Sequence, residues 1–373
     1  MSSVSYLDHN ATTPVLPEVV AAMVDALRAT GNPSSVHRFG RSARRLVETA
    51  RQQVGAAVNA GSAEVVFTGS GTEANNLALL GRAPVLVSAI EHDSVLQAAD
   101  RALPAPVDGN GVIDLAALRD LVLRHRPAVV AVMLANNETG VLQPVAEVAR
   151  IAHEAGALAH CDAVQAFAKA PVDFQALGVD TLSLSAHKIG GPQGVGALIV
   201  RPGIALGTLL RGGGQEKRRR AGTENVAGIV GFGIAASRAN DHLSDSGRRA
   251  ELRDATQLRL QALAPEARVF GEAAARLPNT LCIEMPGVAA ETQVMALDLA
   301  GVAVSAGAAC SSGKVAISPV LRAMGVEDAV ARCAIRVSFG RGNTMADVDR
   351  LVQAWGTLLA RHGTARLRPG TAA

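Results

Sequence analysis

The sequence predicts an α/β protein in which a mostly parallel sheet lies between layers of helices, together with a smaller α+β domain. Three observations support this fold class. The chain has 373 residues, more than one small domain needs. Hydrophobic residues make up 49% of it and charged residues 18%, which excludes a mostly disordered chain. Between residues 60 and 205, short apolar runs alternate with amphipathic stretches of helical length, as in a parallel sheet covered by helices.

The apolar runs are the expected strands of this sheet. In chain order they cover residues 65–68, 85–89, 129–134, 157–161 and 181–185. Each run leads into polar residues, which occupy positions 69–73, 91–93, 136–140, 162–165 and 186–188. Ligands of doubly wound sheets bind outside the carboxyl ends of the strands. The five polar clusters therefore predict one binding pocket.

The composition changes after about residue 205. A stretch rich in glycine and arginine leads into a helix of small residues from Val226 and a charged helix near 248–263. Two alternating strands, at 279–285 and 334–339, and a helix near 345–359 complete the expected elements. The expected large domain comprises residues 14–245, and the expected small domain comprises residues 1–13 and 246–373.

Composition and charge argue against several classes of function. Thirty-six Lys and Arg against 33 Asp and Glu leave a formal charge of +3, too weak a bias to indicate nucleic acid as a partner. No apolar run approaches the roughly 18 residues of a membrane span. The first residues do not resemble a secretory signal, so a cytoplasmic protein is expected. The four cysteines form no C-x-x-C pair and no regular spacing, so neither a disulfide framework nor a bound metal is expected.

The turn Gly69-Ser-Gly-Thr-Glu73 joins the first expected strand to a helix. Such a turn points free backbone N–H groups and the positive end of the helix at an anion, typically a phosphate. It also fits the pattern G-x-G-x-x-A, and with Glu91 further on it forms a weak dinucleotide-binding fingerprint. More than 60 residues precede it, whereas this fingerprint normally opens the first βαβ unit. A glycine turn that only caps a helix is the third interpretation.

Lys188 lies at the end of an expected buried strand. Loss of solvent there lowers the pKa of an amine and favours its attack on a carbonyl. Such a lysine either forms a Schiff base or simply reaches solvent. Asp162 ends the neighbouring strand, where a carboxylate can keep a pyridine nitrogen protonated. The turn, the aspartate and the lysine together indicate pyridoxal 5'-phosphate (PLP) as a cofactor.

With these motifs in place, the sequence resembles the cysteine desulfurases of the NifS/IscS type, which are PLP enzymes of fold type I. The resemblance runs from Tyr6 to Trp355. The motifs that carry it are residues 6–14, 31–40, 72–76, 91–92, 136–140, 162–165, 185–188, 220–223, 305–310 and 336–341. It implies the PLP-transferase fold, with the large domain binding the cofactor.

The resemblance implies a role for each matching residue. Lys188 would form the Schiff base with the cofactor, and His92 would stack on the ring and move protons. Asn137 and Arg336 would bind the substrate, with Arg336 holding its carboxylate through paired hydrogen bonds. The other cofactor-binding residues would be Gly71, Thr72, Asn137, Asp162, Gln165, Ser185, His187 and Thr223. Of these, Thr223 would reach across from the second subunit of a homodimer.

Cys310 would determine the activity. It lies in a segment of small residues, at about 305–315, that is expected to form a mobile loop and expose a thiolate. The implied reaction converts L-cysteine to L-alanine and leaves a persulfide on Cys310. An acceptor protein, either an iron–sulfur scaffold or a thiolation relay, would take the sulfur. The other cysteines, Cys161, Cys282 and Cys333, are expected to be structural.

Three alternatives remain open. Another fold-type I enzyme, such as an aminotransferase or a selenocysteine lyase, would share the PLP-binding residues. An NAD-dependent dehydrogenase would use the turn at Gly69 and would not need Lys188. A non-enzymatic scaffold would not need polar groups at five strand ends.

Overall fold

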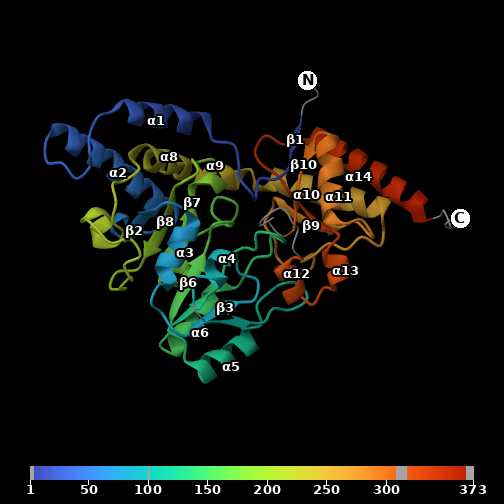
Figure 1. The fold of residues 1–373 in the computed structure, drawn as a ribbon, viewed down its shortest axis with the longest axis horizontal. Coiled ribbons are helices and arrows are strands. Elements are labelled where there is room, and N and C mark those ends of the chain that lie inside the picture. Colours follow the sequence, from blue (N-terminus) through green and yellow to red (C-terminus); the bar gives the residue numbers. More distant parts are fainter. Residues whose placement is uncertain (1–3, 100, 308–316, 367–373) are drawn as a thin grey trace, which may run out of the picture.

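The computed structural model describes residues 4–99, 101–307 and 317–366 (Figure 1). Its central feature is a seven-stranded sheet with the strand order β2-β8-β7-β6-β5-β3-β4. The strands are β2 (Val65–Thr68), β3 (Val85–Ser88), β4 (Ala102–Ala105), β5 (Val129–Ala131), β6 (Leu158–Asp162), β7 (Thr181–Ser185) and β8 (Gly196–Val200). Strands β3 to β7 are parallel to one another, and β8 is antiparallel to both of its neighbours.

The five strands expected from the sequence are all present, and the mostly parallel α/β fold is confirmed. Two strands were not expected. β4 is an edge strand that contains Pro104, which an edge tolerates because its missing N–H faces no partner strand. β8 is a buried apolar run that returns antiparallel to β7.

Helices cover both faces of the sheet. Phe67, Leu182 and Ile199 share one cluster with residues of α2 (Arg38–Ala57), α5 (Leu115–His125), α6 (Val145–Glu154) and α8 (Val226–Ser237). The alternate residues Val66 and Leu198 pack on α3 (Gly71–Leu79). Val85 and Val87 pack on α3 and on α4 (Asp93–Leu96). Because strand side chains alternate between faces, this pattern places the sheet between two helical layers.

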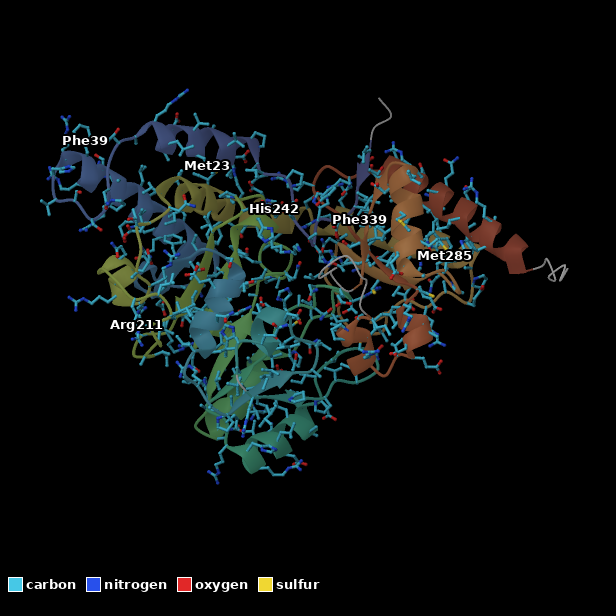
Figure 2. All side chains as sticks on the ribbon, in the orientation of Figure 1. Met23, Phe39, Arg211, His242, Met285 and Phe339 are labelled. Carbon is cyan, nitrogen blue, oxygen red and sulfur yellow. The ribbon has the colours of Figure 1, made fainter. Side chains whose placement is uncertain are left out.

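A second hydrophobic cluster lies around a three-stranded antiparallel sheet, β11-β12-β9. Its strands are β9 (Thr280–Glu284), β11 (Ser305–Ala306) and β12 (Ala334–Ser338), and its helices are α10 (Ser246–Leu263), α11 (Ala290–Leu299) and α14 (Met345–Arg366). Met285 and Phe339 belong to this cluster (Figure 2). The amino-terminal strand β1 (Ser5–Tyr6) pairs with β10 (Val302–Ala303) beside it. The expected domain boundaries stay a prediction.

The remaining helices are short or lie at the periphery. They are α1 (Pro17–Arg28), α7 (Phe174–Leu177), α9 (Ala239–Ser244), α12 (Pro319–Ala323), α13 (Asp328–Ala331), η1 (Ser62–Glu64), η2 (Ala186–Lys188) and η3 (Gln215–Arg218). Of the helices in the described ranges, none combines the length and the apolar character needed to cross a membrane.

Candidate active site

A cavity of about 270 Å³ lies at the carboxyl ends of the strands. It is lined by residues that follow β2, β3, β5, β6 and β7. Of the residues selected from the sequence, the structure brings nine into this one lining: Gly71, Thr72, His92, Asn137, Asp162, Gln165, Ser185, His187 and Lys188. The single pocket expected from five polar strand ends is therefore present.

Three of the selected residues are not part of this lining. Arg336 lies on β12 next to the cavity, where its Nη1 donates to the Asn137 carbonyl at 3.0 Å. Thr223 is exposed in the segment between η3 and α8. Cys310 lies outside the described residues.

One end of the cavity is suited to an anion. Ser70 caps α3 by accepting a hydrogen bond from the Glu73 N–H, so the amino end of this helix points into the cavity. Neither the Thr72 nor the Ser185 hydroxyl has a hydrogen-bond partner among the residues that the structure describes. A Cβ added at Gly71 would come within 2.8 Å of the Val164 side chain, so glycine keeps this turn compact.

Asp162 ends β6 and is almost fully buried. Its Oδ1 accepts from the Val164 N–H at 2.9 Å, and its Oδ2 accepts from the Asn75 amide at 2.7 Å. The Asn75 Oδ1 in turn faces His160 Nε2 at 3.0 Å. Because an amide oxygen only accepts, His160 carries its proton on Nε2. Burial lowers the pKa of His160 to about 3, so the ring is neutral. This chain of hydrogen bonds fixes the position of the Asp162 carboxylate.

His92 caps the amino end of α4. Its Nδ1 accepts from the Ser94 N–H at 3.0 Å. A nitrogen that accepts from a backbone N–H carries no proton, so the neutral ring has its proton on Nε2. His92 therefore presents a hydrogen-bond donor in the cavity it lines.

The Lys188 side chain leaves a single 3-10 turn at the end of β7. Its Nζ donates to the carbonyls of Asn10 at 2.6 Å and Ala11 at 2.8 Å. Burial, and then the positive charge of Arg336, lower the pKa of the amine to about 8. Near neutral pH a fraction of the amine is therefore uncharged and able to act as a nucleophile.

Arg336 is buried and makes an ion pair with Asp8, with 2.7 Å between Nη2 and Oδ1. Its Nε has no hydrogen-bond partner in the described part of the chain. Asp8 Oδ2 also accepts from the Ser305 hydroxyl at 2.8 Å. The guanidinium next to the cavity thus keeps one donor without a partner in the described residues.

Sequence reasoning missed a polar network under the cavity. The Gln165 Nε2 donates to the Asn10 carbonyl at 2.9 Å, and its Oε1 accepts from Lys169 Nζ at 2.7 Å. Lys169 also donates to the Asn10 Oδ1 at 2.9 Å. The four-residue spacing from Gln165 to Lys169 was the one signal available, and it is common on any helical turn.

Glu91, the acid of the possible dinucleotide fingerprint, is not available to a ligand. Its side chain is buried, and its Oε1 accepts from the Ser88 hydroxyl at 2.5 Å and the Met133 N–H at 2.7 Å. Burial raises the pKa of this carboxyl to about 8. A ribose hydroxyl cannot reach it, which argues against the dehydrogenase alternative.

The donor set fits PLP. A helix amino terminus and two unpartnered hydroxyls suit a phosphate, and a buried carboxylate suits a protonated pyridine nitrogen. Lys188 lines the same cavity with an amine of lowered pKa. These groups together match the three ends of PLP: phosphate, ring nitrogen and aldehyde.

Comparisons with known proteins agree with this geometry. A cysteine desulfurase of Gluconacetobacter diazotrophicus is 43% identical, covering 95% of this chain and 93% of the relative. One of Cereibacter sphaeroides is 44% identical, covering 93% of this chain and 94% of the relative. The crystal structure of a NifS-like protein from Rickettsia africae superposes with a TM-score of 0.89 at 36% identity, covering 96% of this chain and 99% of the other. The resemblance to cysteine desulfurases is therefore confirmed.

The family assignment rests on most of the chain. Residues 5–351 match the family model described as aminotransferase class-V. This span contains every residue of the cavity described above. The chain belongs to the aminotransferase class-V family.

Proposed function

We propose that this chain is a PLP-dependent cysteine desulfurase, which converts L-cysteine to L-alanine and leaves a persulfide on Cys310. The observation that carries the proposal is the meeting of Lys188, Asp162 and a phosphate-binding turn in one cavity. Its relatives at more than 40% identity are cysteine desulfurases, which favours this activity over other reactions of the same fold.

Three groups of residues would hold the cofactor. Thr72, Ser185 and His187 would bind its phosphate, together with the amino end of α3. Asp162 would pair with the ring nitrogen, and the Gln165 amide would donate to the phenolic oxygen. When bound here, PLP supplies an electron sink that lets the Cα proton of an amino acid leave.

Arg336 and Asn137 orient the substrate. The Arg336 guanidinium donates paired hydrogen bonds to the carboxylate of L-cysteine, in a two-pronged arrangement that a lysine could not reproduce. Asp8 keeps the guanidinium in place from the other side through its 2.7 Å ion pair. The amino group of the substrate is thereby directed toward Lys188.

Lys188 and His92 handle protons. With a pKa near 8, the Lys188 amine can take the Cα proton and return it. His92 carries its proton on Nε2, because Nδ1 is occupied by the Ser94 N–H. His92 thus keeps a hydrogen-bond donor on a ring that lines the cavity.

Cys310 performs the sulfur transfer. Its thiolate attacks the substrate sulfur, so an S–S bond forms while the bond between Cβ and sulfur breaks. The electron pair of the broken bond stays on carbon, which takes up a proton and becomes the methyl group of L-alanine. The products are L-alanine and a Cys310 persulfide, and atoms and charge balance.

The partners are a second copy of this chain and a sulfur acceptor. Thr223 of one subunit reaches the phosphate site of the other, consistent with its exposure here. The acceptor is an iron–sulfur scaffold or a thiolation relay. A cytoplasmic location stays a prediction.

A Cys310→Ser variant tests the proposal. It should bind PLP normally but form no L-alanine from L-cysteine, because no thiolate is available to take the sulfur. Mass spectrometry should find one added sulfur atom on Cys310 of the unmodified protein and none on the variant. A Cys282→Ala variant, which changes a buried thiol, serves as the control and should keep its activity. L-alanine formation by Cys310→Ser at the normal rate would refute the proposal.

A further inference from the structure

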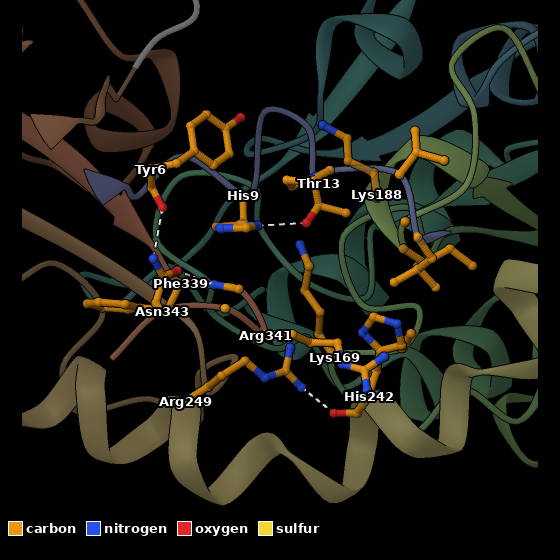
Figure 3. Close-up of a pocket in the computed structure, with 18 of the residues that line it drawn as sticks. Tyr6, His9, Thr13, Lys169, Lys188, His242, Arg249, Phe339, Arg341 and Asn343 are labelled. Atoms are coloured by element: carbon orange, nitrogen blue, oxygen red, sulfur yellow. Dashed lines mark hydrogen bonds between the residues drawn. The ribbon is translucent and has the colours of Figure 1, made fainter. Parts of the chain in front are cut away.

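A second cavity, of about 400 Å³, lies beside the active site (Figure 3). Among the described residues the two cavities have only Lys188 in common. The second one is formed where the amino-terminal segment, the end of α9, the start of α10 and the turn after β12 meet. Its volume is within the range of small-molecule sites.

The lining is unusually positive. Four cationic side chains contribute to it, against one carboxylate, Asp347. The cationic residues are Lys169, Lys188, Arg249 and Arg341. Both oxygens of Asp347 are already engaged, Oδ1 with the Ser5 hydroxyl at 2.6 Å and Oδ2 with the Thr344 N–H at 2.8 Å. With four cations against one carboxylate, the lining does not neutralise its own positive charge.

The buried cations are also poorly paired with counterions. The Lys169 amine donates to two neutral amide oxygens, and no carboxylate of the described residues lies within 4.0 Å of it. Arg249 has a side chain that is 4% exposed, and its nearest acid, Asp245, is 3.7 Å away. Asp245 is itself bound by Arg248 at 2.8 Å. Within the described ranges Lys169 has no acid near it, and Arg249 shares its acid with Arg248. Burial of such weakly paired cations is costly, which indicates that a ligand supplies the missing negative charge.

Two polar atoms are left unsatisfied on the same wall. Arg249 Nε and His242 Nε2 are buried and have no hydrogen-bond partner in the described ranges. His242 is 7% exposed. Figure 3 shows Arg249 extending from its helix toward Lys169 and His242. Both side chains line the cavity, so an oxyanion bound there would lie next to a guanidinium whose hydrogen bonds are incomplete.

The titration of the lining agrees with an uncompensated positive field. Burial first, and then nearby cations, lower the pKa values of His9 and His242 to about 4. Burial, followed by Lys188 and Arg249, lowers the pKa of Lys169 well below its usual value. A bound anion would raise all three.

Part of the lining is apolar. It includes the segment from Pro14 to Pro17, together with Ile189 and Phe339. A purely inorganic anion would leave this part in contact with water, whereas an organic anion would cover it.

We propose that this cavity is a second ligand site, distinct from the cofactor site, that binds a small organic anion. A carboxylate or phosphate group lies against Arg249, Arg341 and Lys169, and an apolar body lies against Pro14 to Pro17 and Phe339. The inference does not depend on the sulfur chemistry, because none of these residues belongs to the cofactor cavity.

Calorimetric titration of the PLP-bound protein tests the site. The cofactor then fills its own phosphate-binding site, so the added anions cannot bind there. The probes are phenyl phosphate, benzoate, inorganic phosphate and uncharged benzyl alcohol. Phenyl phosphate or benzoate should bind saturably, at least about tenfold tighter than inorganic phosphate and benzyl alcohol. The tighter of the two organic anions identifies the preferred head group. Absence of saturable binding, or equal binding of inorganic phosphate, would contradict the proposal.

Matched variants locate the binding. Arg341→Gln changes an exposed residue and leaves folding intact, and Arg249→Gln removes the buried charge. Each should weaken binding at least about tenfold, because a hydrogen bond between charged groups is lost. Arg124→Gln on α5 is the surface control. Arg336→Gln tests whether the probe binds at the substrate site instead. Both variants should bind the organic anion as tightly as the unmodified protein does. Binding that survives Arg341→Gln and Arg249→Gln, or is lost in Arg336→Gln, would overturn the assignment.

Discussion

Lys188 combines three properties at one atom: it ends a buried strand, its pKa is lowered to about 8, and it lines the cavity that holds Asp162. We expect Lys188→Ala to lose the visible absorbance of the lysine-bound cofactor and at least about a thousandfold in activity. Absorbance spectra and L-alanine formation measure the two effects.

A Lys188→Arg variant is the control for charge. It keeps a cation at this position but cannot bond covalently to an aldehyde, so it should fail in the same way as Lys188→Ala. An unchanged spectrum in either variant would remove Lys188 from its proposed role.

Glu91 links burial to pH dependence. Its pKa is about 8 in the folded protein, against an ordinary value of 4.5, so the folded state binds more protons between these values. The stability that this group contributes is complete below pH 4.5 and is lost as the pH rises through about 8. The buried His160 acts in the opposite direction, because its lowered pKa costs stability as the pH falls.

We therefore expect Glu91→Gln to lose less stability than the unmodified protein between pH 5 and pH 8. The slopes should differ by at most about 1.4 kcal/mol per pH unit, the value for one proton. Urea unfolding across this pH range measures the slopes, with the exposed Glu147→Gln as the control. Parallel slopes for Glu91→Gln and the unmodified protein would contradict the burial argument.

The candidate site could be predicted only in part. Some of its residues are marked by the local sequence, whereas others are brought into place by tertiary packing. Asp162 and Lys188 directly follow apolar runs, so local sequence marks them as strand-end groups. Arg336 lies on a different sheet and meets Asp8 across 328 positions of sequence. No local pattern encodes that contact, and only the family resemblance indicated Arg336. Lys169 was missed because its burial depends on tertiary packing.

At the scale of elements, one buried ion pair fixes the segment that leads to Thr223. Arg51 on α2 binds Glu216 in η3 through two hydrogen bonds of 2.7 and 2.8 Å. Both side chains are at most 5% exposed. Glu216 also accepts from the Phe67 N–H at 2.9 Å, so η3 is attached to both a helix and a strand.

We expect Glu216→Gln to lower the free energy of unfolding by about 3–5 kcal/mol, because Arg51 then loses its buried counterion and keeps only the half-exposed Glu48. Glu48→Gln is a matched control, since Glu48 contacts the same arginine but is 49% exposed. Its loss should be at most about 1 kcal/mol. Equal losses in urea unfolding would show that burial does not determine the strength of this pair.

The sheet itself could be predicted because its core strands are short apolar runs that end in polar groups. β8 was not predicted because it is the return strand of an antiparallel pair and has no polar cluster at its end. β4 was not predicted because it contains a proline, which normally argues against a strand. Edge position and chain direction are properties of the assembled sheet, so local sequence does not reveal them.

At the scale of the whole molecule, an apolar stripe on α1 faces outward. Val20, Val24 and Leu27 are 49%, 39% and 72% exposed, and they line a surface groove together with Val15. Phe39 lies at the outer end of α2, in the same part of the molecule as α1, and is 51% exposed (Figure 2). Exposed apolar patches of this kind are typical of subunit interfaces, which supports the proposed homodimer.

We expect light scattering to give twice the chain mass of 38.2 kDa. Leu27→Glu should reduce the mass to that of one chain, because a charge would be buried in the interface. Leu123→Glu changes a leucine of similar exposure, 66%, on α5 and should leave the dimer intact. A single-chain mass for the unmodified protein would exclude the homodimer.

The first strand of the chain has its partners near the other end of the sequence. The Leu7 N–H donates to Ala303, and the Leu7 carbonyl accepts from Ser338. A ribosome adds about 5–20 residues per second, so the amino terminus waits on the order of tens of seconds for these partners to be synthesised. During that interval Leu7 has no core to enter, so the amino-terminal segment stays unpaired until residues 303 and 338 have been synthesised.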